Sequence, residues 1–139
     1  MKKVKKLSVI IIAILAVVVF SIPVMAANAG ILNSGFDFDL GPGEDEFSEA
    51  ASKSAGTSYA DVDVTQFISS YSRDNMSFRV YRTRGTSYPL SETRTVNNTY
   101  YFSLAYTSTG ASYSEDTYLR GYGSSANYDS VWAYGSWWA

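Results

Sequence analysis

The sequence predicts a mostly β protein with a single antiparallel β-sandwich or small barrel of about five to six strands. We expect a short acidic N-terminal segment, helical or disordered, before these strands. Three observations predict this fold class. Tyr, Thr, Val and Phe, which favour strands, are abundant in the later part of the chain. Ser, Gly and Asn recur between them and mark turns, while helical patterning of Leu and Ala is nearly absent after residue 60.

The first residues predict a Sec-type signal peptide over 1–26. Four lysines within residues 2–6 form a positive region, and the apolar run Leu7–Phe20 follows. Small residues then offer a cleavage site near Ala26 or Ala29. An uncleaved anchor is the alternative, but a full span needs about 20 apolar residues, and this run is shorter. We therefore expect a secreted, extracellular protein that meets a membrane only through its signal peptide before cleavage.

The composition removes whole classes of chemistry. The chain has no cysteine and no histidine, so disulfide bonds, thiolate nucleophiles, zinc sites and Ser-His-Asp catalysis are excluded. Basic residues form no continuous footprint, and the formal net charge is −2, so we expect no nucleic-acid partner. We predict that the protein is not an enzyme.

Residues 27–57 are expected to form an acidic, partly flexible arm. Phe36–Leu40 is a candidate short strand, and Gly41–Gly43 breaks it. Glu44–Ser54 has acids at its start and Lys53 at its end, a charge order that favours a short helix. Its one large apolar side chain is Phe47, so we expect this segment to be weakly docked.

Residues 58–139 are expected to form the antiparallel β domain. Ser58–Val64 alternates apolar and polar side chains, as a half-buried strand does. A rival interpretation starts one or two helical turns at Asp63, because apolar residues follow it at helical spacing. The next strand is expected over Met76–Arg84.

The second half of this domain contains the clearest hairpin signal. Leu90–Val96 and Thr99–Thr107 flank Asn97-Asn98, and asparagine tolerates the positive φ of a tight turn. A loop is expected over 108–114. The last two strands are then expected over Glu115–Tyr122 and Asn127–Trp138.

The acidic arm begins like a calcium loop but departs from it. Proline stands where the EF-hand turn needs glycine, and serine stands where the bidentate glutamate belongs. We expect a solvated acidic arm and no cofactor, with calcium in another geometry as the alternative. The candidate ligands in that case are Asp37, Asp39, Glu44 and Asp45.

Aromatic side chains are the strongest compositional signal, at 16% of the chain. Some of them belong in the core, where Phe78 and Phe102 are candidates. The rest exceed what one core face can absorb, and exposed aromatics form recognition surfaces. The candidate ligand-binding residues are Tyr100, Tyr106, Tyr122, Tyr128, Tyr134, Trp137, Trp138 and Arg79. The two terminal tryptophans also indicate a last strand that is pinned in the sheet, as core or as partner contact.

The organisation of the chain resembles that of small secreted β-rich proteins of Gram-positive bacteria. The shared features are the lysine-rich leader, the cysteine-free body and the aromatic, glycine-containing C-terminal strand over Tyr128–Trp138. The layout is also similar to that of lactococcin-like β-sandwich bacteriocins, which end in aromatics. This resemblance implies secretion.

Together these features predict a secreted, non-enzymatic β domain that binds through an aromatic surface. The expected partner is a cell-surface glycan or protein, or a second copy of the chain. A bacteriocin-like, membrane-active protein and a self-associating extracellular matrix component are the alternatives.

Overall fold

The computed structural model describes residues 34–139. The predicted signal peptide, its cleavage sites and the first residues of the predicted arm lie outside the described residues. Within residues 34–139, no helix has the length and apolar character needed to cross a bilayer.

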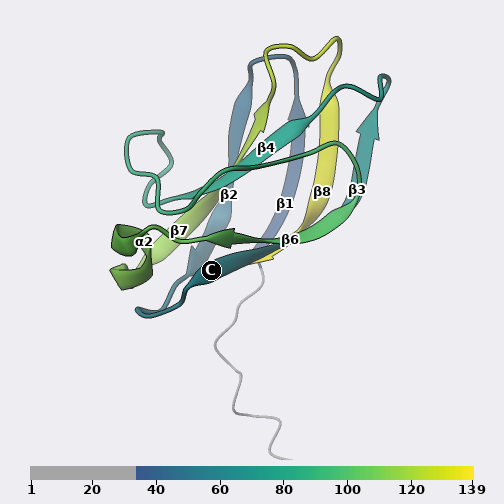
Figure 1. The fold of residues 1–139 in the computed structure, drawn as a ribbon. Coiled ribbons are helices and arrows are strands. Elements are labelled where there is room, and N and C mark those ends of the chain that lie inside the picture. The colour runs from purple at the N-terminus through teal and green to yellow at the C-terminus, as the bar shows by residue number, and fades with distance from the viewer. Residues whose placement is uncertain (1–33) are drawn as a thin grey trace, which may run out of the picture. The chain divides into compact units, whose positions relative to one another are not determined.

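The described chain forms eight strands and one short helix, in the order β1 (Ser34–Leu40), β2 (Asp45–Ser52), β3 (Tyr59–Ser69), β4 (Met76–Tyr81), β5 (Arg94–Val96), β6 (Tyr100–Ala105), α2 (Ser108–Ser112), β7 (Asp116–Gly123) and β8 (Val131–Trp138). Sheet A has the strand order β1-β8-β3-β6, and sheet B has the order β2-β7-β4-β5. All pairs are antiparallel, and the two sheets pack as a sandwich (Figure 1). This strand order is that of a jelly roll.

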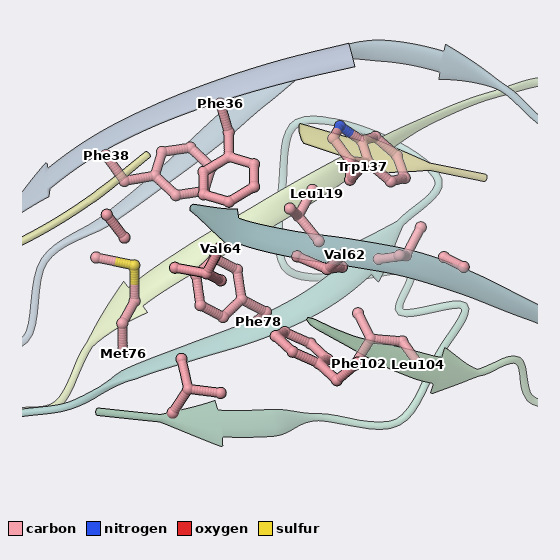
Figure 2. Close-up of a cluster of buried hydrophobic side chains, with 14 of the residues drawn as sticks. Phe36, Phe38, Val62, Val64, Met76, Phe78, Phe102, Leu104, Leu119 and Trp137 are labelled. Atoms are coloured by element: carbon pink, nitrogen blue, oxygen red, sulfur yellow. The ribbon is translucent and has the colours of Figure 1, made fainter. Parts of the chain in front are cut away.

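Strict alternation along the strands builds the interior. In β1, Phe36, Phe38 and Leu40 are buried while the residues between them are exposed. Rings from both sheets meet in the middle, as Figure 2 shows: Phe36 lies 5.2 Å from Phe38 and 5.5 Å from Phe78, and Phe78 lies 5.7 Å from Phe102, measured between ring centroids. Aromatic pairs at these separations stabilise the fold by more than the burial of their apolar surface alone. The core therefore holds the two sheets together through phenylalanines of β1, β4 and β6.

Two glycines make room for these rings. A Cβ atom at Gly121 would lie 2.4 Å from the Phe38 ring, and one at Gly135 would lie 2.8 Å from Phe36 and 2.0 Å from the carbonyl oxygen of Asp63. Both approaches are far inside van der Waals contact. The close packing of β7 and β8 against the β1 phenylalanines thus requires glycine at both positions.

The fold class is confirmed as mostly β, a sandwich of two antiparallel sheets, but the strand count of five to six is wrong because residues 34–139 form eight strands. Two strands come from the predicted acidic segment. One of them, β1, contains the candidate strand Phe36–Leu40, which is confirmed. The helix expected over Glu44–Ser54 is the strand β2, which pairs with β7 and contains a bulge between Phe47 and Ala50. Ser48 is buried at this bulge, where its hydroxyl oxygen accepts the N–H of Leu119. Pairing with a strand about 70 residues later overrides the local charge pattern.

Lys53 explains why the end of this segment is ordered. Its ammonium group donates to the carbonyl oxygens of Ser54 and Tyr113, at 3.0 Å each, and lies 4.5 Å above the ring of Tyr106. Burial lowers the pKa of Lys53 below its ordinary value. The lysine thus ties the end of β2 to the segment after α2 instead of capping a helix.

The predicted hairpin around Asn97-Asn98 is also wrong for the residues next to the turn. β5 pairs with β4 in sheet B, whereas β6 pairs with β3 in sheet A, so the chain changes sheets at this turn. Direct pairing between the two arms is confined to residues 90–92 and 105–107. No non-glycine residue of the described chain has a positive φ. The turn is therefore a sandwich corner, which alternation alone does not distinguish from a hairpin.

The helical alternative at Asp63 is wrong as well. β3 runs as one strand to Ser69, with a register shift against β8 between Val64 and Gln66. The extra residue, Thr65, donates its hydroxyl to the carbonyl oxygen of Tyr134. A β-bulge changes the alternation by one residue, and this shift accounts for the helix-like spacing of the apolar residues.

Candidate functional site

The outer face of sheet A gathers aromatic rings and carboxylates from all four of its strands. The register aligns Asp37 with Tyr134, Asp39 with Trp132, and Asp61 with Trp138. On the other side of β3, Asp63 lies opposite Tyr101. We call this surface the aspartate–aromatic face, and it consists of Asp37, Asp39, Asp61, Asp63, Tyr59, Tyr101, Trp132, Tyr134 and Trp138.

Its rings are available to a ligand. The side chains of Tyr59, Tyr101 and Tyr134 are between 46% and 58% exposed. Trp132 and Tyr134 stand on one strand with ring centroids 6.3 Å apart and planes only 20° apart. The indole N–H of Trp132 donates to a carboxylate oxygen of Asp37 at 2.6 Å, which fixes the direction of the ring across β1. The two rings are therefore nearly parallel and one of them is anchored.

A second carboxylate organises the other side of the face. Asp61 accepts a hydrogen bond from the hydroxyl of Ser103 on the neighbouring strand. Partial desolvation, followed by the negative charges of Asp61 and Asp63, raises the pKa of Tyr101 above its ordinary value of 10. Tyr101 is consequently a neutral hydroxyl donor throughout the physiological pH range.

The charge of this sheet has one sign. The strands β1, β3, β6 and β8 contain four aspartates and no lysine or arginine. An anionic ligand would meet uncompensated repulsion here. The arrangement suits a ligand that offers hydroxyl groups or positive charge together with apolar surface.

The predicted binding residues do not form one surface. Tyr134 and Trp138 lie on the aspartate–aromatic face. Tyr122 and Arg79 lie on the outer face of sheet B. Tyr128 is next to Tyr71, with centroids 5.4 Å apart.

The remaining three predicted residues occupy different surroundings. Tyr100 is exposed on the edge strand β6, with the guanidinium of Arg94 5.9 Å from its ring centroid. Tyr106 is partly buried beneath Lys53. Trp137 has no exposed surface and belongs to the core, because it alternates inward with Val131, Ala133 and Gly135 along β8. Of the two roles expected for the terminal tryptophans, the core role holds for Trp137.

Sequence reasoning missed Tyr59, Tyr101 and Trp132 as members of the face. The signal for two of them is present in the alternation: residues 59, 61 and 63 share one side of β3, and residues 132, 134, 136 and 138 share one side of β8. The position of Tyr101 opposite Asp63 follows only from the pairing of β6 with β3.

The four carboxylates considered for calcium do not converge: Asp37 and Asp39 lie on the aspartate–aromatic face, whereas Glu44 and Asp45 have partners elsewhere. Asp37 is hydrogen-bonded to Trp132, and Glu44 accepts the backbone N–H of Gly41 at 2.8 Å. Asp45 forms an ion pair with Arg120 at 2.8 Å. Within residues 34–139, no three acidic side chains come together in a group that could hold a metal ion.

No known protein family matches the chain, and neither a curated protein nor a solved structure matches it. The fold and the face define the class of protein at this level: a β-sandwich that exposes tyrosines on its outer surface.

Proposed function

We propose that the protein is a secreted, non-enzymatic binding domain that holds a neutral glycan on the aspartate–aromatic face. The observation that carries this proposal is the combination of five aromatic side chains and four aspartates on a sheet whose strands contain no basic residue. Rings, acceptors and hydroxyl donors without cations are the groups that an uncharged, hydroxyl-rich ligand needs.

The rings supply the apolar part of the contact. One side of a sugar ring presents C–H groups, which pack on the electron-rich face of Tyr or Trp. Trp132 and Tyr134 offer two nearly parallel rings, 6.3 Å apart, along β8. Trp138 lies further along the same side of this strand. A chain of several sugar units would therefore meet successive rings along β8.

The aspartates supply the polar part. Asp37 accepts one hydrogen bond from Trp132 and Asp61 accepts one from Ser103, and a carboxylate has further acceptor sites. Hydrogen bonds from a neutral hydroxyl to a carboxylate are stronger than those between two neutral groups. The hydrogen bond from Trp132 to Asp37 also holds the indole ring in place before the ligand arrives, which reduces the entropy lost on binding.

A cationic protein surface is the second candidate, because four aspartates without a basic residue also attract lysine and arginine side chains. Arginine stacks on aromatic rings and forms forked hydrogen bonds with carboxylates. Salt dependence separates the two ligands. Screening weakens an ion-paired complex strongly, whereas a neutral glycan should bind with less than a twofold change.

The test is a screen of the purified protein against neutral and acidic glycans, followed by calorimetry on the best neutral oligosaccharide. Substitution Tyr134→Ala should weaken this binding about tenfold or more, which corresponds to about 1.4 kcal/mol. Tyr88→Ala is the matched control, since Tyr88 is 60% exposed but lies in the connection between β4 and β5.

The proposal fails if no neutral glycan is retained, or if Tyr88→Ala weakens binding as much as Tyr134→Ala does. Near-ultraviolet circular dichroism of each variant checks that the sandwich is intact. Retention of basic proteins in place of glycans, with strong salt dependence, would establish the second candidate.

A further inference from the structure

The outer face of sheet B places two arginines directly opposite each other. Arg79 of β4 and Arg120 of β7 are register partners in the antiparallel pair. Like charges at opposite positions of neighbouring strands destabilise a sheet. Both guanidinium groups also share Tyr81, with their central carbons 5.8 and 5.9 Å from its ring centroid. The ring holds the two cations near one another without neutralising them.

One of these two charges lacks a counter-charge. Arg120 donates from Nε to the carboxylate of Asp45 at 2.8 Å, and its side chain is only 19% exposed. Arg79 donates from Nε to the carbonyl oxygen of Ser91 at 2.8 Å, which is a neutral partner. Among residues 34–139, no carboxylate lies within ion-pair distance of Arg79. The two arginines therefore place two positive charges beside the single negative charge of Asp45, in a partly desolvated place.

The two guanidiniums line the same cavity. It has a volume of about 150 Å³, and its lining includes both arginines together with hydroxyl-bearing side chains. We call it the arginine cavity, and its polar lining consists of Ser77, Arg79, Tyr81, Thr93, Arg120 and Tyr122. Each Nε is already used. Within the described chain the terminal guanidinium nitrogens of Arg79 make no hydrogen bond, whereas Arg120 has the Tyr81 hydroxyl as a second partner besides Asp45. The remaining terminal nitrogens and the hydroxyls are the donors available to a ligand.

We propose that the arginine cavity binds a tetrahedral oxyanion, either a phosphate or a sulfate group. Guanidinium forks match the oxygen pairs of such anions, and hydrogen bonds between charged partners are the strongest available to a protein. A bound anion would supply the missing negative charge and relieve the repulsion between Arg79 and Arg120. This site lies on the sheet opposite to the aspartate–aromatic face, so it is independent of the proposed glycan binding.

The direct test is a titration of the protein with inorganic phosphate at constant ionic strength, with chloride as the balancing anion. The readout is the NMR signals of the arginine Nε–H groups. The signals of Arg79 and Arg120 should shift together and saturate. Substitution Arg79→Gln should weaken binding about tenfold or more. Arg79→Lys, which keeps the charge but loses the fork, should weaken it several-fold.

Arg94→Gln is the matched control. Arg94 also lies over a tyrosine, 5.9 Å from the centroid of Tyr100, but it is outside the arginine cavity. This variant should bind phosphate as the unchanged protein does. A response that does not saturate, or that is the same in Arg79→Gln and Arg94→Gln, would overturn the proposal. If Arg79→Gln fails to fold, the comparison of Arg79→Lys with Arg94→Gln decides in its place.

Two further arms identify the source of the anion. If a phosphomonoester binds more tightly than inorganic phosphate, the ligand is a phosphoryl group on a larger molecule. If the two bind with equal affinity, the ligand is the free ion. Titration with inorganic sulfate shows whether affinity depends on the charge of the anion. Tyr134→Ala should leave phosphate binding unchanged. A failure of this proposal is thereby distinguished from a failure of glycan binding.

Discussion

The outer faces of the two sheets differ in charge although they cover the same core. The strands of sheet A carry four aspartates and no basic residue, whereas the strands of sheet B have mixed charge: β4, β5 and β7 carry Arg79, Arg94 and Arg120, and β2 and β7 carry Asp45, Glu46, Glu49 and Asp116. Aromatic rings accompany both sets of charges. On sheet A the rings are organised by carboxylates, as Trp132 is by Asp37, and on sheet B they lie beneath guanidiniums, as Tyr122 does beneath Arg120 at 5.0 Å.

The exposed aromatic side chains of this protein therefore do not form one surface. Tyrosine supports either kind of charge, because its ring face attracts cations and its hydroxyl donates to carboxylates. The side of the sandwich on which a tyrosine lies therefore decides its neighbours and the ligand that it suits. Two chemically separate faces should respond separately to substitution.

The substitution with the greatest consequence should disturb the whole sandwich, and therefore both outer faces. A methyl group at Gly135 would collide with the ring of Phe36 and with the backbone of Asp63, so Gly135→Ala should destabilise the fold by about 3 kcal/mol or more. Chemical denaturation, with tryptophan fluorescence as the readout, measures the change in the free energy of unfolding. Gly35→Ala is the control, because a Cβ at Gly35 would come no closer than 3.9 Å to any atom outside its immediate neighbours. Equal stability of the two variants would contradict the packing described for β8.

A smaller effect separates the faces. Tyr134→Ala should weaken glycan binding about tenfold and leave phosphate binding unchanged. Tyr122→Ala should weaken phosphate binding several-fold and leave glycan binding unchanged, because Tyr122 lines the arginine cavity. Calorimetry with each ligand and each variant provides the comparison. Loss of both activities in either variant would show that the two faces are not independent.

The smallest change at neutral pH is expected for Tyr106, in the interior between the two sheets. The hydroxyl of Tyr106 is buried near Thr117 without a hydrogen bond of ordinary geometry, and desolvation raises its pKa well above 10. The folded protein thus keeps this proton at pH values where the unfolded chain releases it. Stability should be unaffected below about pH 10 and should fall above it, by up to about 1.4 kcal/mol per pH unit.

Tyr106→Phe tests this alkaline limit. The variant should be close to the unchanged protein in stability at pH 7, since it removes a buried polar group that has no partner. Above pH 10 its free energy of unfolding, measured by urea titration, should fall less steeply than that of the unchanged protein. An identical decline in both proteins would assign the alkaline limit to other tyrosines.

Local alternation predicted the strands from which the interior is built, with exceptions that have physical causes. Met76–Tyr81 and Val131–Trp138 lie within the predicted ranges because one side of each strand faces the core. The β2 segment was missed because its partner in β7 is distant in sequence, and pairing supplied the stability that its few apolar residues do not. The bulge at Thr65 imitated helical spacing, which a single strand cannot reveal.

The candidate sites were less predictable than the fold. Tyr134, Trp138 and Arg79 were candidates from composition and lie on outer faces of the sheets, but Trp137 and Tyr106 were candidates too, and these are buried or partly buried. Asp37 and Asp39 were considered as metal ligands, and they instead line an aromatic surface with Trp132 and Tyr134. Arg120 was missed because nothing local distinguishes it. Its place in the proposed anion site follows from its position opposite Arg79.

The β class, the absence of imidazole and thiol chemistry, and the surplus of aromatic rings follow from the amino-acid sequence alone, because they depend on residue types and on the two-residue period of a strand. Which rings are exposed, and which charges accompany them, depends on how the strands pair. The reason is that the strand order β1-β8-β3-β6 and β2-β7-β4-β5 places side chains from distant segments on one face. Alternation assigns a residue to a side of its own strand, and only pairing assigns it neighbours.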